Sequence, residues 1–353
     1  MSFQLTIEPL GATIDVEDGQ TMLDAALRNG IYLPHACGHG LCGSCKVQVL
    51  DGEIDVGEAN PFALMDFERD EGKALACCAT LQADATIEAD IDDEPDALVI
   101  PVRDFAAEVE RIEDLTPTVR AIWLRLDKPL QFQAGQYVQL EIPGLGQSRA
   151  FSIANAPHEV EASGCIEINV RRVPGGLGTG YLHEQLRIGQ RLRLSGPYGR
   201  FFVRHSAQRP LLFMAGGSGL SSPRSMIRDL LHRGCKLPIT LVYGQRSAAE
   251  LYYDREFREL AARHANFDYV PALSETPAGT TEVAQGFVHE VAREHFAGDF
   301  SQHSAYLCGP PLMIDACIGA LMQGRLFEHN IYHEKFLSAA DAQQVRSPLF
   351  KRI

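Results

Sequence analysis

The chain has 353 residues, of which 45% are hydrophobic and 22% are charged. These proportions are typical of a folded globular protein of about two to three domains, and they exclude a disordered chain, a collagen-like repeat and a disulfide miniprotein. The net charge of −14 argues against nucleic acid as a partner, because phosphate binding needs clustered Lys and Arg. No apolar run is long enough to span a membrane and the first residues do not resemble a signal peptide, so we expect no membrane association and a cytoplasmic protein with reduced or ligating cysteines.

The negative charge is concentrated near the N-terminus. Residues 1–94 contain 19 acidic and four basic residues, whereas the rest of the chain contains 27 and 28. Such an acidic segment is either a solvated surface or a docking surface for a basic protein. A short strand is predicted at 85–89. The acidic tract 90–96 that follows contains Pro95 and can bury little, which predicts a linker.

Five of the nine cysteines lie between residues 37 and 78. Cys37, Cys42 and Cys45 have the spacing C-x4-C-x2-C, which with a distant fourth cysteine is the plant-type pattern for a [2Fe-2S] cluster held by four thiolates. Structural zinc sites use paired short spacings and are the less favoured alternative. The intervening glycines would let the backbone approach the cluster. Spacing alone does not decide between Cys77 and Cys78 as the fourth ligand.

The middle third of the chain alternates apolar and polar residues, which predicts several short strands and an antiparallel barrel or sandwich. The strands are expected at 119–126, 137–142, 150–154 and 166–173. Arg149, Phe151 and Ser152 could provide a phosphate clamp, a stacking ring and a hydrogen bond. The glycine-rich run 175–182 opens a predicted helix ending near Gly189, and the free N–H groups at its start suit a pyrophosphate.

After about residue 209, apolar runs alternate with helical stretches, which predicts a parallel sheet covered on both faces. The strands are expected at 211–215, 239–243, 267–271 and 304–308, and the helices at 222–233, 254–264 and 313–322. The glycine turn before the first helix would aim N–H groups and the helix dipole at a pyrophosphate, although it departs from the G-x-G-x-x-G pattern. Ser222 is predicted to cap that helix and Pro223 to be its first residue.

Together these segments resemble known electron-transfer proteins. Residues 3–90 are similar to a plant-type ferredoxin domain, and the rest is similar to the ferredoxin–NADP reductase superfamily. This order is that of the reductase components of bacterial multicomponent oxygenases, and the loop Ala36–Cys45 and the segment Tyr332–Phe336 most resemble those of phenol hydroxylase and related toluene/alkene monooxygenases. The resemblance implies a β-grasp ferredoxin domain (1–94), a linker (95–101), an antiparallel FAD-binding β-barrel (102–206), an α/β parallel-sheet NAD(P)-binding domain (207–340) and a C-terminal tail (341–353).

The resemblance also implies roles for individual residues. Of the two adjacent cysteines it selects Cys77, with Cys37, Cys42 and Cys45 as the other cluster ligands. It implies catalytic roles along the hydride path for Ser152, Cys308 and Glu334. Phe336 would cover the flavin ring, although a tail of 17 further residues departs from reductases that end at the aromatic residue. The other expected cofactor-binding residues are Arg149, Ala150, Phe151, Asn169, Val170, Arg171, Gly176, Gly178 and Thr179 for FAD, and Gly216, Gly217, Ser218, Gly219, Gly244, Arg246, Gly309, Pro310 and Met313 for the nicotinamide nucleotide.

The implied activity is electron transfer from NADH, through FAD and the [2Fe-2S] cluster, to the oxygenase component of a multicomponent monooxygenase. FAD is needed because NADH delivers two electrons together, whereas the cluster passes them singly. We favour NADH over NADPH because Glu250, near Arg246, would repel a 2′-phosphate. The acidic ferredoxin domain is then the expected docking surface. The alternatives are a reductase of an aromatic-ring dioxygenase or of an iron–sulfur deoxygenation system and, more distantly, a non-catalytic metal-binding redox sensor or adaptor.

Overall fold

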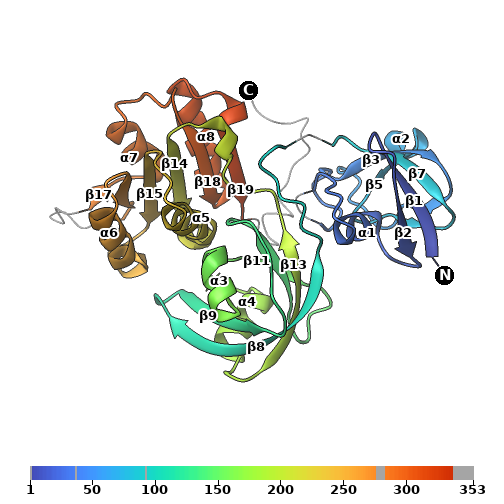
Figure 1. Cartoon of the computed structure of the whole chain (residues 1–353), viewed down its shortest axis with the longest axis horizontal. Coiled ribbons are helices and arrows are strands. Elements are labelled where there is room, and N and C mark those ends of the chain that lie inside the picture. Colours follow the sequence, from blue (N-terminus) through green and yellow to red (C-terminus); the bar gives the residue numbers. More distant parts are fainter. Residues whose placement is uncertain (1, 36–37, 92–93, 276–282, 337–353) are drawn as a thin grey trace. The chain divides into compact units, whose positions relative to one another are not determined.

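The structure is a computed structural model that describes residues 2–35, 38–91, 94–275 and 283–336 (Figure 1). The described residues up to Arg103 form one compact unit, and those from Asp104 onward form a second. Among the described residues, no helix has both the length and the apolar character that a membrane span requires.

A mixed five-stranded sheet forms the centre of the first unit, in the order β2-β1-β7-β3-β5. β1 pairs in parallel with β7, whereas β1 with β2 and β3 with both β5 and β7 are antiparallel. α1 begins after Thr21, whose hydroxyl accepts a hydrogen bond from the amide of Asp24, and its apolar residues are buried. This arrangement confirms the predicted β-grasp fold. Its elements are β1 (Ser2–Glu8), β2 (Ala12–Glu17), α1 (Met22–Arg28), β3 (Lys46–Asp51), β4 (Ile54–Asp55), α2 (Asp66–Asp70), β5 (Lys73–Leu75), β6 (Thr80–Leu81) and β7 (Ala85–Glu88).

The second unit begins with a six-stranded sheet in the order β11-β10-β13-β8-β9-β12. A bridge between Ile153 and Ile168 joins the two edge strands, so the sheet closes on a core of alternating inward residues and the predicted barrel is confirmed. Three predicted ends are too late. The helix predicted to end near Gly189 ends at Glu184, and the chain turns at Gly189, with a φ of +83°, before β13. The strands predicted at 150–154 and 166–173 end at Ser152 and Arg171. The elements are β8 (Arg103–Asp114), β9 (Val119–Leu126), β10 (Tyr137–Glu141), β11 (Arg149–Ser152), α3 (Pro157–Ser163), β12 (Cys165–Arg171), α4 (Leu177–Glu184) and β13 (Arg191–Tyr198).

A parallel six-stranded sheet in the order β17-β16-β15-β14-β18-β19 completes the second unit. Helices cover both of its faces (Figure 1). Phe213 of β14 packs on the side of α5 and α6, and the next residue, Met214, packs on the side of α7 and α8. This confirms the predicted α/β lobe. Its main elements are β14 (Leu211–Gly216), α5 (Ser221–His232), β15 (Ile239–Gln245), α6 (Asp254–Arg263), β16 (Phe267–Leu273), β17 (Ala284–Gln285), α7 (Val288–His295), β18 (Ser304–Gly309), α8 (Pro311–Gln323) and β19 (Ile331–Lys335).

The start of α5 differs from the prediction. A 3₁₀ turn at Gly217–Leu220 runs directly into the helix, which begins at Ser221. Ser222 therefore lies inside the first helical turn and is not the cap. Its side chain is fully buried. Because its hydroxyl does not cap the helix, it can form a hydrogen bond with another element.

Candidate functional site

The described cysteines of the first unit gather in neighbouring loops. Cys42 and Cys45 precede β3, and Cys77 and Cys78 lie between β5 and β6 with their sulfur atoms 3.7 Å apart. A hydrogen bond from Cys77 lowers the pKa of Cys45, so these two side chains are neighbours as well. The fourth predicted ligand, Cys37, lies outside the described residues.

The backbone around these sulfurs fits an iron–sulfur cluster. Gly38, Gly40 and Gly43 have φ values of +70°, +72° and +75°, which glycine adopts without strain. The amide of Gly40 donates to the sulfur of Cys77 at 3.3 Å, and a Cβ on Gly40 would lie 2.7 Å from the sulfur of Cys78. Cysteine thiolates with a backbone amide directed at a ligand sulfur are typical of such clusters. The choice of Cys77 over Cys78 as ligand stays a prediction.

The barrel brings the residues predicted to bind FAD to one edge. A Cβ on Gly178, near the start of α4, would lie 3.5 Å from the Cγ atom of Arg149 on β11. The predicted phosphate clamp and the predicted pyrophosphate-binding helix start are therefore neighbours. Phe151 is partly buried against the barrel core. The hydroxyl of Thr179 donates to the carbonyl of Gly176 at 3.3 Å, which closes the turn.

The three residues predicted on β12 have different environments. Arg171 reaches the glycine turn of the nucleotide lobe, because its Nη1 atom lies 3.1 Å from the position of a Cβ on Gly217. Val170 is buried in the barrel core. The amide of Asn169 is already engaged: it donates to Glu167 at 2.9 Å and accepts from Ser221 at 3.4 Å.

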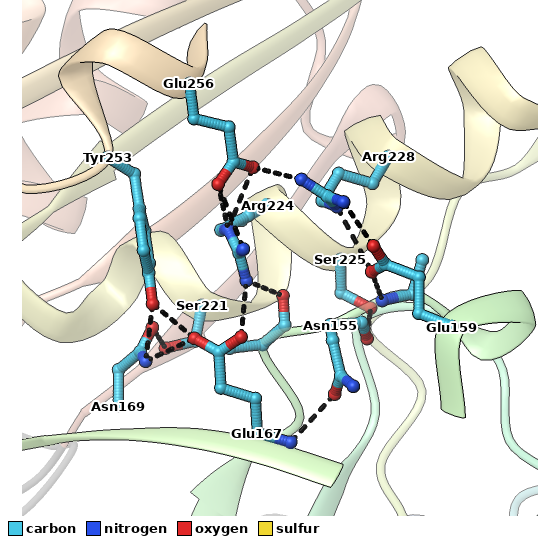
Figure 2. Close-up of polar contacts among 12 residues, drawn as sticks. Asn155, Glu159, Glu167, Asn169, Ser221, Arg224, Ser225, Arg228, Tyr253 and Glu256 are labelled. Carbon is cyan, nitrogen blue, oxygen red and sulfur yellow. Dashed lines mark hydrogen bonds and ion pairs between the residues drawn. The ribbon is translucent and has the colours of Figure 1, made fainter. Parts of the chain in front are cut away.

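A polar network centred on Arg224 of α5 joins the barrel to the nucleotide lobe (Figure 2). The guanidinium donates to Glu167 of β12 and to the carbonyl of Ala154 at 3.0 Å each, and to Glu256 of α6 at 3.0–3.2 Å. It also stacks over the ring of Tyr253 at 4.0 Å. Arg224 and Glu167 are 6% and 2% exposed, so a buried ion pair connects the two lobes. The sequence did not reveal this network, because ion pairs between distant elements leave no periodic signal.

The glycine turn of the nucleotide lobe packs tightly against the end of β18. A Cβ on Gly219 would lie 2.3 Å from the carbonyl oxygen of Cys308, and one on Gly216 would lie 2.3 Å from the sulfur of Met313. Gly309 has a φ of +153°, and a Cβ on it would lie 3.0 Å from the carbonyl oxygen of Gly216. The predicted nucleotide-binding residues of β14 and β18 are thus brought together at the carboxyl edge of the sheet, where ligands bind in open parallel sheets.

Gly244 and Arg246, predicted to bind the nicotinamide nucleotide, lie at the end of β15 and just after it. A Cβ on Gly244 would lie 2.2 Å from the side chain of Val288, so this glycine is needed for the packing of α7. The carboxylate of Glu250 accepts hydrogen bonds from two threonines of the barrel, at positions 116 and 118. The acid that faces Arg246 is therefore Glu275, 4.0 Å away in an exposed pair.

The three predicted catalytic residues meet at one carboxylate. β19 pairs with β18 so that Glu334 stands opposite Cys308. The hydroxyl of Ser152 lies 3.4 Å from Oε2 of Glu334, and the thiol of Cys308 lies 3.9 Å from the same atom. Ser222, which was predicted only as a cap, also donates to Oε2 at 3.2 Å. Phe336 is partly buried beside this group, and its amide donates to the carbonyl of Gly309 at 3.0 Å.

Burial dominates the electrostatics of this group. It raises the pKa of Glu334 to about 7, while hydrogen bonds from Ser222, Ser152 and Cys308 act in the opposite direction. Burial also raises the pKa of the Cys308 thiol well above its usual value. Near neutral pH the thiol is therefore a neutral donor, and Glu334 can both hold and release a proton.

Comparison with known proteins identifies each part of the chain. The model of the 2Fe-2S iron-sulfur cluster binding domain matches residues 5–82, that of the oxidoreductase FAD-binding domain matches 106–203, and that of the oxidoreductase NAD-binding domain matches 213–318.

Whole-chain relatives share this organisation. The reductase component of phenol 2-monooxygenase from Pseudomonas sp. (strain CF600) is 56% identical, and the phenol hydroxylase P5 protein of Acinetobacter pittii (strain PHEA-2) is 55% identical, each over the full length of both chains. The Amycolatopsis cytochrome P450 reductase GcoB is 37% identical in sequence. Its crystal structure matches this fold with a TM-score of 0.87 over 96% of this chain and 99% of that one. The chain therefore belongs to the family of NAD(P)H-dependent flavin iron–sulfur reductases that includes the reductase components of multicomponent monooxygenases.

Proposed function

We propose that this chain transfers electrons from NADH, through FAD and a [2Fe-2S] cluster, to the oxygenase component of a phenol-hydroxylating monooxygenase. The observation that carries this proposal is the 56% identity, from end to end, to a phenol 2-monooxygenase reductase component. The convergence of Ser152, Cys308 and Glu334 supports it, because these groups come from both lobes of one compact unit.

The proposed division of labour follows from the two lobes. Bound FAD supplies the chemistry that accepts a hydride and gives up electrons singly. Arg149 and the amides at the start of α4 would hold its pyrophosphate, since a helix N-terminus and a guanidinium both favour an anion. The ring of Phe151 would stack on the flavin. Ser152 and Glu334 would hold a proton beside the reacting edge.

The thiolates of Cys37, Cys42, Cys45 and Cys77 would hold the cluster in the first unit. The support for Cys77 is the amide of Gly40, which already donates to its sulfur at 3.3 Å. Amide donors of this kind stabilise the negative charge of a cluster and contribute to its potential.

NADH is the proposed electron donor. A 2′-phosphate needs clustered positive charge, and Arg246 lies 4.0 Å from the acid Glu275 in an exposed pair. One arginine beside a carboxylate is better suited to ribose hydroxyls than to a phosphate. Glu250 is not the acid that would repel a 2′-phosphate, because its carboxylate accepts hydrogen bonds from barrel threonines.

The acidic first unit is the proposed docking surface for the oxygenase component. Three of its five basic residues form ion pairs within the unit: Arg28 with Asp24 at 2.9 Å, Lys46 with Glu68 at 2.5 Å and Lys73 with Glu71 at 3.2 Å. The remaining acids near the cysteine loops, such as Asp55, Glu58 and Asp66, are exposed. This excess of negative charge would attract a basic surface on the partner and increase the rate of association.

Reconstitution tests the proposal. The FAD- and cluster-loaded chain is mixed with purified oxygenase components of a phenol monooxygenase or of an aromatic-ring dioxygenase, and NADH-dependent hydroxylation is measured. We expect coupled turnover with the phenol monooxygenase. Turnover with the dioxygenase alone would overturn the assignment of the partner, and the absence of any NADH-dependent reduction would overturn the reductase activity itself.

A further inference from the structure

Ser222 is a buried hydroxyl that the helix does not need. Its side chain is 0% exposed, and the N-cap position of α5 is occupied by Leu220. A buried hydroxyl without a hydrogen bond costs free energy, so its partner is informative. Its hydroxyl donates to the carboxylate of Glu334, at 3.2 Å, on a strand more than 100 residues away in the sequence. The other group that it contacts is the thiol of Cys308, which faces the same carboxylate.

Three elements direct donors at one oxygen atom. Oε2 of Glu334 is 3.2 Å from the hydroxyl of Ser222 on α5, 3.4 Å from that of Ser152 on β11 and 3.9 Å from the thiol of Cys308 on β18. The distance to Ser222 is the shortest of the three. Donors that converge on a single oxygen both orient a carboxylate and favour its ionised form.

We propose that Ser222 is a positioning residue for the NADH-dependent reaction: its buried hydroxyl holds the carboxylate of Glu334 beside Ser152 at the edge of the predicted flavin site. This inference rests on the proposed function for its consequence, but its geometry does not depend on it. A carboxylate released from Ser222 keeps only the longer contacts to Ser152 and Cys308.

Among the residues that the structure describes, no charged group takes the place of Ser222 beside Glu334. The titratable group facing Glu334 from β18 is Cys308, which burial keeps neutral. On β19 itself, His333 and Lys335 point to the opposite face of the sheet, where Lys335 pairs with Asp315 of α8 at 2.7 Å. On α5, the charge of Arg224 is engaged by its own two carboxylates. The hydroxyl and thiol donors therefore stabilise the ionised carboxylate of Glu334, which burial destabilises.

The same helix supplies a matched control. Ser225 lies three residues after Ser222, is also 0% exposed, and donates its hydroxyl to the carbonyl of Asn155 at 2.8 Å. Replacing either serine by alanine removes one buried hydroxyl and its hydrogen bond. Only the change at Ser222 removes a contact to Glu334.

The experiment is an infrared pH titration of the full-length, FAD-loaded chain. The band of the protonated Glu334 carboxyl is identified by its loss in Glu334→Gln. Ser222→Ala is expected to raise the titration midpoint by about one pH unit, because a hydrogen bond to a charged group contributes roughly 1.5 kcal/mol and one unit corresponds to about 1.4 kcal/mol. Ser222→Thr, which keeps the hydroxyl, and Ser225→Ala are expected to leave the midpoint unchanged.

A second measurement is the pH profile of flavin reduction by NADH, followed by single-turnover absorbance. In Ser222→Ala this profile is expected to shift by the same amount as the infrared midpoint. Equal midpoints in Ser222→Ala and the unchanged protein would overturn the inference, as would an equal shift in Ser225→Ala. Failure of the proposed function is distinguished from this result, because a chain that NADH cannot reduce still gives the infrared titration.

Discussion

Replacing Arg224 by Met tests whether the buried ion pair holds the two lobes of the second unit together. The substitution removes a guanidinium that is 6% exposed and keeps a side chain of similar length. It leaves Glu167, 2% exposed, without its cation and deprives Glu256 of one of its two arginines. Removing one partner of a buried pair costs about 3–5 kcal/mol, because the remaining charge is uncompensated. We expect a loss of this size in the free energy of unfolding.

Arg228 provides the comparison. It pairs with Glu159 and also contacts Glu256, but its side chain is 27% exposed, so Arg228→Met is expected to cost about 1 kcal/mol. The double substitution Arg224→Met with Glu167→Gln removes both charges of the buried pair and is expected to recover at least half of the loss.

Urea unfolding measures these differences. The chain has a single tryptophan, Trp123 on β9 of the barrel, so its fluorescence reports unfolding of the lobe on one side of the interface. A cost below about 1 kcal/mol for Arg224→Met, or a cost no greater than that of Arg228→Met, would refute the reasoning, since it would mean that the pair is not desolvated in solution.

Further predictions concern the cofactor sites and the docking surface. Cys77→Ser is expected to abolish the visible absorbance of the iron–sulfur cluster while Cys78→Ser retains it, and the opposite pattern would overturn the assigned ligand. Gly219→Ala is expected to weaken NADH binding at least tenfold by calorimetry, because the new Cβ would lie 2.3 Å from a backbone oxygen. Gly180→Ala is expected to leave NADH binding unchanged, because its new Cβ would meet no atom within 4 Å. Burial raises the pKa of Glu334 from 4.5 to about 7. The protonated carboxyl therefore contributes fully to the free energy of unfolding below about pH 4.5, and up to about 3 kcal/mol is lost as the pH rises through about 7. Glu334→Gln is expected to remove this pH dependence from urea midpoints measured across that range. Electron delivery to the oxygenase component is expected to slow as salt rises above about 0.1 M, because steering by exposed acids is screened; a rate independent of salt would contradict docking through the acidic surface.

Local pattern was sufficient to predict the barrel and the parallel sheet, whereas the β-grasp fold of the first unit was implied by the family resemblance. Alternation located strands such as β9, whose limits Val119–Leu126 match the prediction, because a half-buried strand leaves a period-2 signal. The sequence did not predict β19, a strand of five residues. A short edge strand forms because it pairs with its neighbour, and its own residues carry little pattern. Yet β19 is what places Glu334 opposite Cys308.

Tertiary contacts limited what could be predicted of the site. Ser222 before Pro223 has the local pattern of a helix cap, but a preceding 3₁₀ turn extends the helix past it and turns its hydroxyl toward another strand. Gly244 was predicted to bind the nucleotide, which stays a prediction, but the sequence did not reveal that the packing of α7 leaves no room for a side chain there. Sequence spacing identifies which residues can do chemistry, but the pairing of distant elements decides which of them meet.

Anaerobic titration with NADH, followed by visible absorbance and electron paramagnetic resonance, tests the central claim most directly. If the two lobes pass electrons from NADH to the cysteine loops of the first unit, the flavin absorbance should bleach and the resonance signal of a reduced [2Fe-2S] cluster should grow in the same titration. Bleaching of the flavin in a protein that contains the cluster, without any cluster signal, would contradict the claim.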